Sequence, residues 1–107
     1  MTPEISVQAL SDLLADPAAA PFLLDVREPW EWDLAHIDGS VLLPMQLIPL
    51  RHNTLPDDRL IVTICHHGMR SLQVCHFLQQ AGFDQVVSLR GGIDAWSQTI
   101  DPALPRY

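Results

Sequence analysis

Residues 60–71 read LIVTICHHGMRS, a largely apolar run followed by a polar loop that opens with Cys65. Beyond the loop, apolar residues recur at helical spacing as far as Gly82, a residue typical of helix C-termini. The order predicts a buried strand, a tight loop and a helix. In such a unit the loop N–H groups and the start of the helix converge on one point, where they bind anions and favour a thiolate. The segment therefore predicts a nucleophilic cysteine in an anion-binding loop.

Other apolar runs of strand length lie on both sides of this unit. We expect strands at residues 22–26, 41–43, 60–64 and 86–89. Helical patterns occupy residues 7–14, 29–34, 45–50 and 71–81, and a last one begins after Gly91-Gly92. The alternation predicts a single α/β domain over residues 1–107, with a mainly parallel sheet of about four to five strands and helices on both faces.

Composition limits what this domain can bind. The 107 residues include thirteen acidic residues, six arginines and no lysine, for a formal charge of -7, so we expect no nucleic-acid partner. No apolar run approaches the roughly 20 residues that span a bilayer, and the N-terminus lacks a signal pattern. The spacing of Cys65 and Cys75 is poor for a disulfide framework. We therefore expect a cytoplasmic protein that does not bind membranes.

The chain resembles a stand-alone rhodanese domain, the single-domain fold of sulfurtransferases. Four segments in order carry this resemblance, namely LLDVRE at 23–28, AHIDGS at 35–40, the Cys65 loop and LRGGIDAW at 89–96. The second segment differs from the family's usual Gly-His-Ile-Pro-Gly-Ala at Ala35, Asp38 and Ser40. The resemblance covers nearly the whole chain, and the difference concerns local turn geometry.

The resemblance implies that Cys65 takes sulfur from thiosulfate or a protein persulfide, holds it as a persulfide, and passes it to cyanide, a small thiol or a protein thiol. It implies no metal and no organic cofactor. It also implies structural rather than catalytic roles near the site for Asp25, Arg27 and His36. Asp25 ends an apolar strand, so its burial needs a partner, either Arg27 or the Cys65 loop.

The length of the loop separates this reading from a phosphatase. Four residues lie between Cys65 and Arg70, whereas cysteine-dependent phosphatases use a loop longer by one residue to surround a tetrahedral phosphate. A shorter ring crowds phosphate and suits a sulfur atom carried on the cysteine. The sequence therefore favours sulfur transfer over phosphate hydrolysis.

We assign catalysis to Cys65 and substrate binding to the rest of the loop: His66, His67, Gly68, Met69, Arg70 and Ser71. Arg70 is expected either to contact an anionic donor or to hold the loop shape. The two histidines are interpreted as rim residues or as solvated side chains, in preference to zinc ligands. Gly68 is expected to permit a backbone angle that other residues avoid.

Several features stay outside the proposed chemistry. Cys75 is predicted to be a small packed hydrophobe, and the three tryptophans, Trp30, Trp32 and Trp96, are predicted to be core residues. Residues 101–107 are expected to lie extended on the surface, and the sequence assigns them no function. Two alternatives remain open. One is a non-catalytic binding module, and the other is a sulfur-relay carrier loaded by a cysteine desulfurase.

Overall fold

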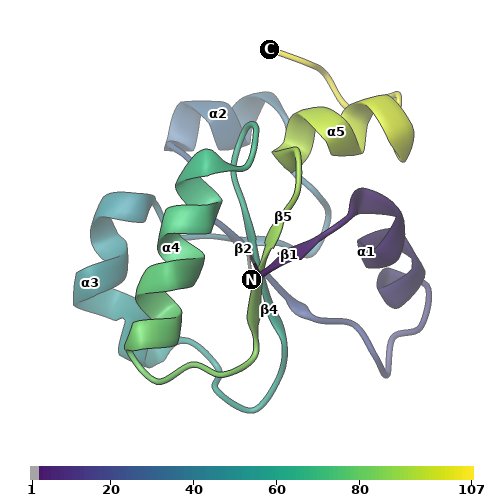
Figure 1. The fold of residues 1–107 in the computed structure, drawn as a ribbon. Helices are drawn as coiled ribbons and strands as arrows, with labels where there is room; N and C mark the ends of the chain where they lie inside the picture. The colour runs from purple at the N-terminus through teal and green to yellow at the C-terminus, as the bar shows by residue number, and fades with distance from the viewer. Residues whose placement is uncertain (1–2) are drawn as a thin grey trace.

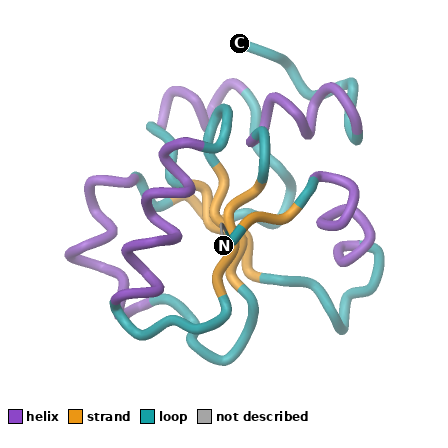
Figure 2. The backbone as a smooth tube through the Cα atoms, in the orientation of Figure 1, coloured by secondary structure: helices purple, strands orange, loops and turns teal. Residues whose placement is uncertain are grey.

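The computed structural model describes residues 3–107 and contains a five-stranded sheet in the order β1-β5-β4-β2-β3, with each neighbouring pair parallel. The strands are β1 (Glu4–Ile5), β2 (Phe22–Asp25), β3 (Val41–Leu42), β4 (Ile61–Ile64) and β5 (Val86–Leu89). Figure 2 shows these strands gathered at the centre of the molecule, with the helices around them. The predicted α/β class and parallel sheet are confirmed.

Helices pack on both faces of the sheet and create two apolar cores. They are α1 (Val7–Leu14), α2 (Pro29–Leu34), α3 (Ile48–Arg51), α4 (Met69–Gln80) and α5 (Gly92–Thr99). Figure 1 shows α3 and α4 on one side of the sheet and α1 and α5 on the other. Because successive strand residues point to opposite faces, Leu23 and Val62 join the core under α1 and α5, whereas Leu24 and Ile61 join the core under α3 and α4.

Two predicted helices have different boundaries. The helix expected at residues 45–50 is a 3-10 turn at Met45–Leu47 followed by α3, because Pro49 lacks the N–H that a continuous helix would need. Helix α4 begins at Met69 rather than at residue 71. Gly68 provides the turn, with φ at 111°, and its carbonyl oxygen accepts a hydrogen bond from the N–H of Leu72 at 3.2 Å.

The edge strand β1 is absent from the sequence prediction. It has two residues, and it is held by the parallel ladder to β5, in which the N–H of Arg90 donates to the oxygen of Ile5 at 2.9 Å. The carboxyl ends of the parallel strands meet at one edge, where ligands of such sheets usually bind. Cys65 directly follows β4 at this edge. Within residues 3–107, no helix has the length and apolar character needed to cross a membrane.

Candidate active site

The Cys65 thiol lies at the bottom of its loop. The residue is 1% exposed, and its Sγ accepts a hydrogen bond from the N–H of Gly68 at 3.0 Å. The hydroxyl of Ser71 lies 3.4 Å from the same sulfur and also contacts the Ser88 hydroxyl at 2.7 Å. An N–H donor at this distance stabilises negative charge on sulfur. The loop therefore places one of its N–H groups, that of Gly68, against the buried sulfur.

Helix α5 fixes the other side of the loop. The N–H of Ile93 donates to the oxygen of Cys65 at 2.9 Å, and the N–H of Asp94 donates to the oxygen of His66 at 3.1 Å. Gly92 makes this approach possible, because a Cβ at this position would overlap both carbonyl oxygens. The first turn of α5 thus binds the carbonyl groups of the loop.

Arg70 makes a two-pronged ion pair with Glu31 of α2. Its Nη1 and Nη2 donate to the two carboxylate oxygens at 2.7 and 2.9 Å. Glu31 is 3% exposed, and the hydrogen bonds from Arg70 lower its pKa to about 2. The same pairing raises the pKa of Arg70. The guanidinium is therefore anchored to α2 in this structure, while its side chain still forms part of the wall beside Cys65.

Tyr107 joins this network from the C-terminal segment. Its hydroxyl donates to Oε2 of Glu31 at 2.8 Å and accepts from Nη1 of Arg27 at 2.8 Å. Its ring stacks on His66, with centroids 3.9 Å apart and planes at 7°. Residues 101–107, to which the sequence assigns no function, therefore reach the Cys65 loop through Tyr107. The segment returns to the Cys65 loop, and its Tyr107 pairs with Glu31 across 76 positions, which no local pattern reveals.

Asp25, the buried carboxylate at the end of β2, pairs with Arg27, the first of the two partners that the sequence suggests. Arg27 is fully buried, and its Nε and Nη2 donate to Asp25 at 2.8 and 2.6 Å. Nη2 also donates to the oxygen of Ala35 at 2.6 Å. The pair lies below Tyr107 and Glu31 and connects them to the sheet, so Asp25 and Arg27 support the site from beneath.

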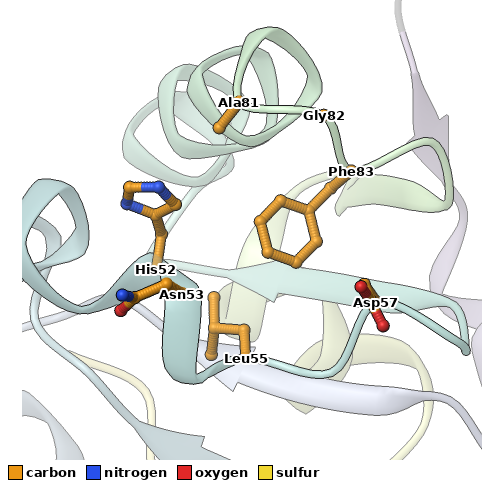
Figure 3. Close-up of a pocket in the computed structure, with 7 residues that line it drawn as sticks. All are labelled: His52, Asn53, Leu55, Asp57, Ala81, Gly82 and Phe83. Atoms are coloured by element: carbon orange, nitrogen blue, oxygen red, sulfur yellow. The ribbon is translucent and has the colours of Figure 1, made fainter.

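A hollow opens beside the sulfur. Its volume is about 390 Å³, and its lining consists of Cys65, His66, His67, Met69, Arg70 and Gln73. A second hollow of about 260 Å³ lies at the far end of α4, between residues such as His52 and Phe83 (Figure 3). Because no residue of the Cys65 loop lines the second hollow, only the first is adjacent to the proposed nucleophile.

A known protein family matches this chain over most of its length. The Rhodanese-like domain family matches residues 6–99. The chain belongs to this family.

Relatives of rhodanese type occur both as separate domains and inside longer chains. A protein of Allochromatium vinosum named sulfurtransferase is 43% identical over 98 residues, which cover 92% of this chain and 91% of that protein. An adenylyltransferase and sulfurtransferase, uba4 of Ogataea parapolymorpha, is 33% identical over 96% of this chain, which spans only 25% of that protein. The crystal structure of a rhodanese-related protein of Thermoplasma volcanium matches with a TM-score of 0.82 and 31% identity, covering 90% of this chain and 91% of that one.

The two loop histidines of this rhodanese-like domain form a stack. The rings of His66 and His67 are 3.9 Å apart, so His66 lies between His67 and Tyr107. Burial lowers the pKa of His66, whereas His67 is mostly exposed. Both line the hollow. Across the part of the chain that the structure describes, no group of three or more side chains is arranged to hold a metal ion.

His36 lies outside the hollow. Its Nδ1 is 2.9 Å from the oxygen of Trp32, and the two rings stack with centroids 3.9 Å apart. Of the tryptophans predicted to be core residues, Trp96 is buried, but Trp30 is 60% exposed. The prediction for Trp30 is wrong because the first turn of α2 directs Glu31, not Trp30, toward the interior.

The second cysteine of this rhodanese-like domain is packed as predicted. Cys75 is fully buried in the core under α3 and α4, and burial raises its pKa to about 11. Sequence reasoning missed Glu31 and Tyr107. Glu31 had a weak signal, since an acidic residue in a first helical turn is common and here closes a capping box with Glu28.

Proposed function

We propose that the protein is a sulfurtransferase that accepts sulfur on Cys65 and passes it to a thiol. The observation that carries this proposal is the position of the Cys65 sulfur. The sulfur accepts a hydrogen bond from the N–H of Gly68 at 3.0 Å and lies beside an open hollow. Its loop has four residues between Cys65 and Arg70. The name sulfurtransferase of the Allochromatium vinosum relative supports the same reaction class.

The reaction has two displacements at sulfur. The Cys65 thiolate attacks the outer sulfur of thiosulfate or of a persulfide, and a new S–S bond forms as sulfite or the donor thiolate leaves with the electron pair. An acceptor thiolate then attacks the outer sulfur of the Cys65 persulfide, and Cys65 leaves as a thiolate. The Gly68 N–H is positioned to stabilise negative charge on sulfur in both steps.

Arg70 holds the loop in the form that these displacements need. Two of its N–H groups are already bonded to the carboxylate of Glu31, which also compensates its charge. A small anionic donor in the hollow therefore meets less free positive charge than an unpaired arginine would supply. His66, His67 and Met69 form the rest of the wall against which a donor or acceptor binds.

A protein donor or acceptor is supported by a second line of evidence. The uba4 relative joins an adenylyltransferase to a sulfurtransferase in one longer chain, as its name states. This association favours a relay, in which sulfur passes between proteins and free thiosulfate is incidental. A relay uses the same Cys65 persulfide, so it changes the partners and not the chemistry.

The test is the intact mass of the reduced protein after incubation with thiosulfate and, separately, with glutathione persulfide. We expect the wild type to gain one sulfur atom that cyanide removes. The Cys65→Ser variant should gain none while keeping its circular dichroism spectrum. The Cys75→Ala variant, which removes the buried second thiol, should gain sulfur as the wild type does. A folded wild type that gains sulfur from neither donor would overturn the proposal.

A further inference from the structure

The carboxylate of Glu31 is paired with Arg70, a cation in the wall of the hollow at Cys65. We propose that Glu31, acting through Arg70, selects the donor that loads Cys65. It withholds the guanidinium from a small dianion such as thiosulfate and so favours a persulfide carried on a thiol. The inference rests on the proposed function and names the class of donor. Glu31 is a positioning residue, since the lining of the hollow contains Arg70 and not Glu31.

Arg70 is the one permanent cation among the described residues that line this hollow. The hydrogen bonds to Glu31 raise the pKa of Arg70 most, and negative charge on Cys65 raises it further. The guanidinium therefore interacts with charge at the sulfur. A dianionic donor that brings its outer sulfur to Cys65 comes within range of the same guanidinium, so the state of Arg70 affects how well that donor binds.

The ion pair is fixed rather than mobile, because four donors hold the Glu31 carboxylate. Arg70 donates to both oxygens, at 2.7 and 2.9 Å. The N–H of Glu28 donates to Oε1 at 3.0 Å, and the hydroxyl of Tyr107 donates to Oε2 at 2.8 Å. The side chain of Glu31 is only 4% exposed, and the bonds from Arg70 lower its pKa to about 2, so it is charged at neutral pH. Separating the pair would leave a nearly buried charge without compensation, so a mobile anion does not draw the guanidinium away.

The histidines of the hollow do not replace the withheld charge. Burial lowers the pKa of His66, which is therefore neutral at pH 8. The side chain of His67 is 63% exposed, and its Nδ1 lies 4.0 Å from the carboxylate of Asp94. A charge that His67 gains at low pH thus has a carboxylate beside it. The wall of the hollow suits a donor whose binding does not depend on a cation.

The effect of Glu31 is on net charge and not on the supply of hydrogen-bond donors. The guanidinium of Arg70 has N–H groups beyond the two that Glu31 accepts, so it can still donate to a bound molecule. Charge is what separates thiosulfate from a persulfide on a neutral thiol. Glutamine has nearly the shape of glutamate without its charge, so Glu31→Gln leaves the charge of Arg70 uncompensated.

The experiment compares two donors, thiosulfate and the persulfide of β-mercaptoethanol, which has no charged group besides its terminal sulfur. Loading of Cys65 is followed at pH 8 and low salt by acid quench and intact mass. The result is expressed as the ratio of the two second-order rate constants, thiosulfate over persulfide. A change in the reactivity of the Cys65 thiolate, or a loss of folded protein, acts on both donors and cancels in this ratio.

We expect Glu31→Gln to raise this ratio about ten-fold, because the uncompensated guanidinium attracts the dianion more strongly than the persulfide. The double variant Glu31→Gln/Arg70→Gln replaces the ion pair by a neutral pair, so its ratio should return to that of the wild type. Glu28→Gln is the matched control. It removes one negative charge from the residue that precedes α2, keeps the N–H that binds Glu31, and should leave the ratio nearly unchanged.

Three results would overturn the inference. The first is a ratio in Glu31→Gln no higher than in Glu28→Gln, and the second is a rise that survives in the double variant. The third is a double variant far below the wild type, since Arg70 would then already serve thiosulfate in the wild type. If circular dichroism shows Glu31→Gln to be unfolded, the comparison of the double variant with the wild type decides. A folded wild type that gains sulfur from neither donor contradicts the proposed function itself, so the two failures are distinguished.

Discussion

The two sides of the Cys65 loop differ sharply in how they are held. On one side, Arg70, Glu31, Tyr107 and Arg27 form a continuous chain of hydrogen bonds that ends on the buried Asp25. Figure 1 shows the loop before α4 lying near α2 and α5, which supply the groups that hold it. This bonded side has almost no exposed atoms on Glu31 or Arg27.

The other side of the loop is open. Met69 is largely exposed there, and Gln73 lines the hollow that leads to the sulfur. The contrast leaves one direction open for a group that approaches the sulfur. Support on the bonded side keeps the Gly68 N–H aimed at the sulfur, and the open side leaves the attacking group a path.

The largest expected effect comes from removing the close approach of α5 to the loop. In Gly92→Ala, the new Cβ overlaps the carbonyl oxygens of Cys65 and His66, and the residue must also keep a φ of 61°. We expect a loss of about 3 kcal/mol in the free energy of unfolding, measured with urea.

Gly39→Ala is the matched control for this prediction. Gly39 also has a positive φ, 84°, but no atom lies within 4 Å of the added Cβ. It should therefore lose only about 1 kcal/mol, the cost of the backbone angle alone. Equal losses in the two variants would show that contact with the loop carbonyls contributes nothing to stability.

A smaller effect is expected from the ion pair on the bonded side. Arg70 lowers the pKa of Glu31 to about 2 from an ordinary value of 4.5, so the carboxylate stabilises the fold fully above about pH 4.5 and loses this contribution as the pH falls toward 2. Glu31→Gln should cost about 2 kcal/mol at pH 7. The difference between wild type and variant should then shrink steadily in urea titrations from pH 5 to pH 3. A difference that stays constant with pH would contradict the pairing.

Most of the fold was accessible to sequence reasoning because its central strands carry strong patterns. β2, β4 and β5 are buried, so their apolar runs stand out between turn residues. β1 has only two residues and exists through its pairing with β5, so no periodicity predicts it. The split at Pro49 follows from a missing N–H and was open to prediction.

The candidate site likewise combines a part that is contiguous in sequence with a part that joins distant residues. The Cys65 loop is contiguous in sequence, so its spacing predicts an enclosed sulfur. The bonded side joins Arg70 to Glu31 across 39 positions and Tyr107 to Glu31 across 76. A single sequence contains no signal for pairings between residues that lie this far apart in the chain. Trp30 shows the reverse error, because an apolar residue was assigned to the core although its helix turns it outward.

The smallest effects compare the two sides directly, through one side chain from each. Tyr107→Phe keeps the ring on His66 but removes the hydroxyl that links Arg27 to Glu31. Because both partners are buried, we expect a loss of about 1 kcal/mol in unfolding free energy.

Met69→Ala removes more atoms than Tyr107→Phe, yet from a side chain that is 77% exposed. We expect its unfolding free energy to stay within about 0.5 kcal/mol of the wild type, because little contact is lost. Urea denaturation of both variants at pH 7 tests the comparison. The number of atoms removed predicts the larger loss of stability for Met69→Ala, whereas burial predicts the larger loss for Tyr107→Phe. If Met69→Ala destabilises the protein more than Tyr107→Phe, the open side of the loop contributes to folding, and the division between a supporting side and a binding side is wrong.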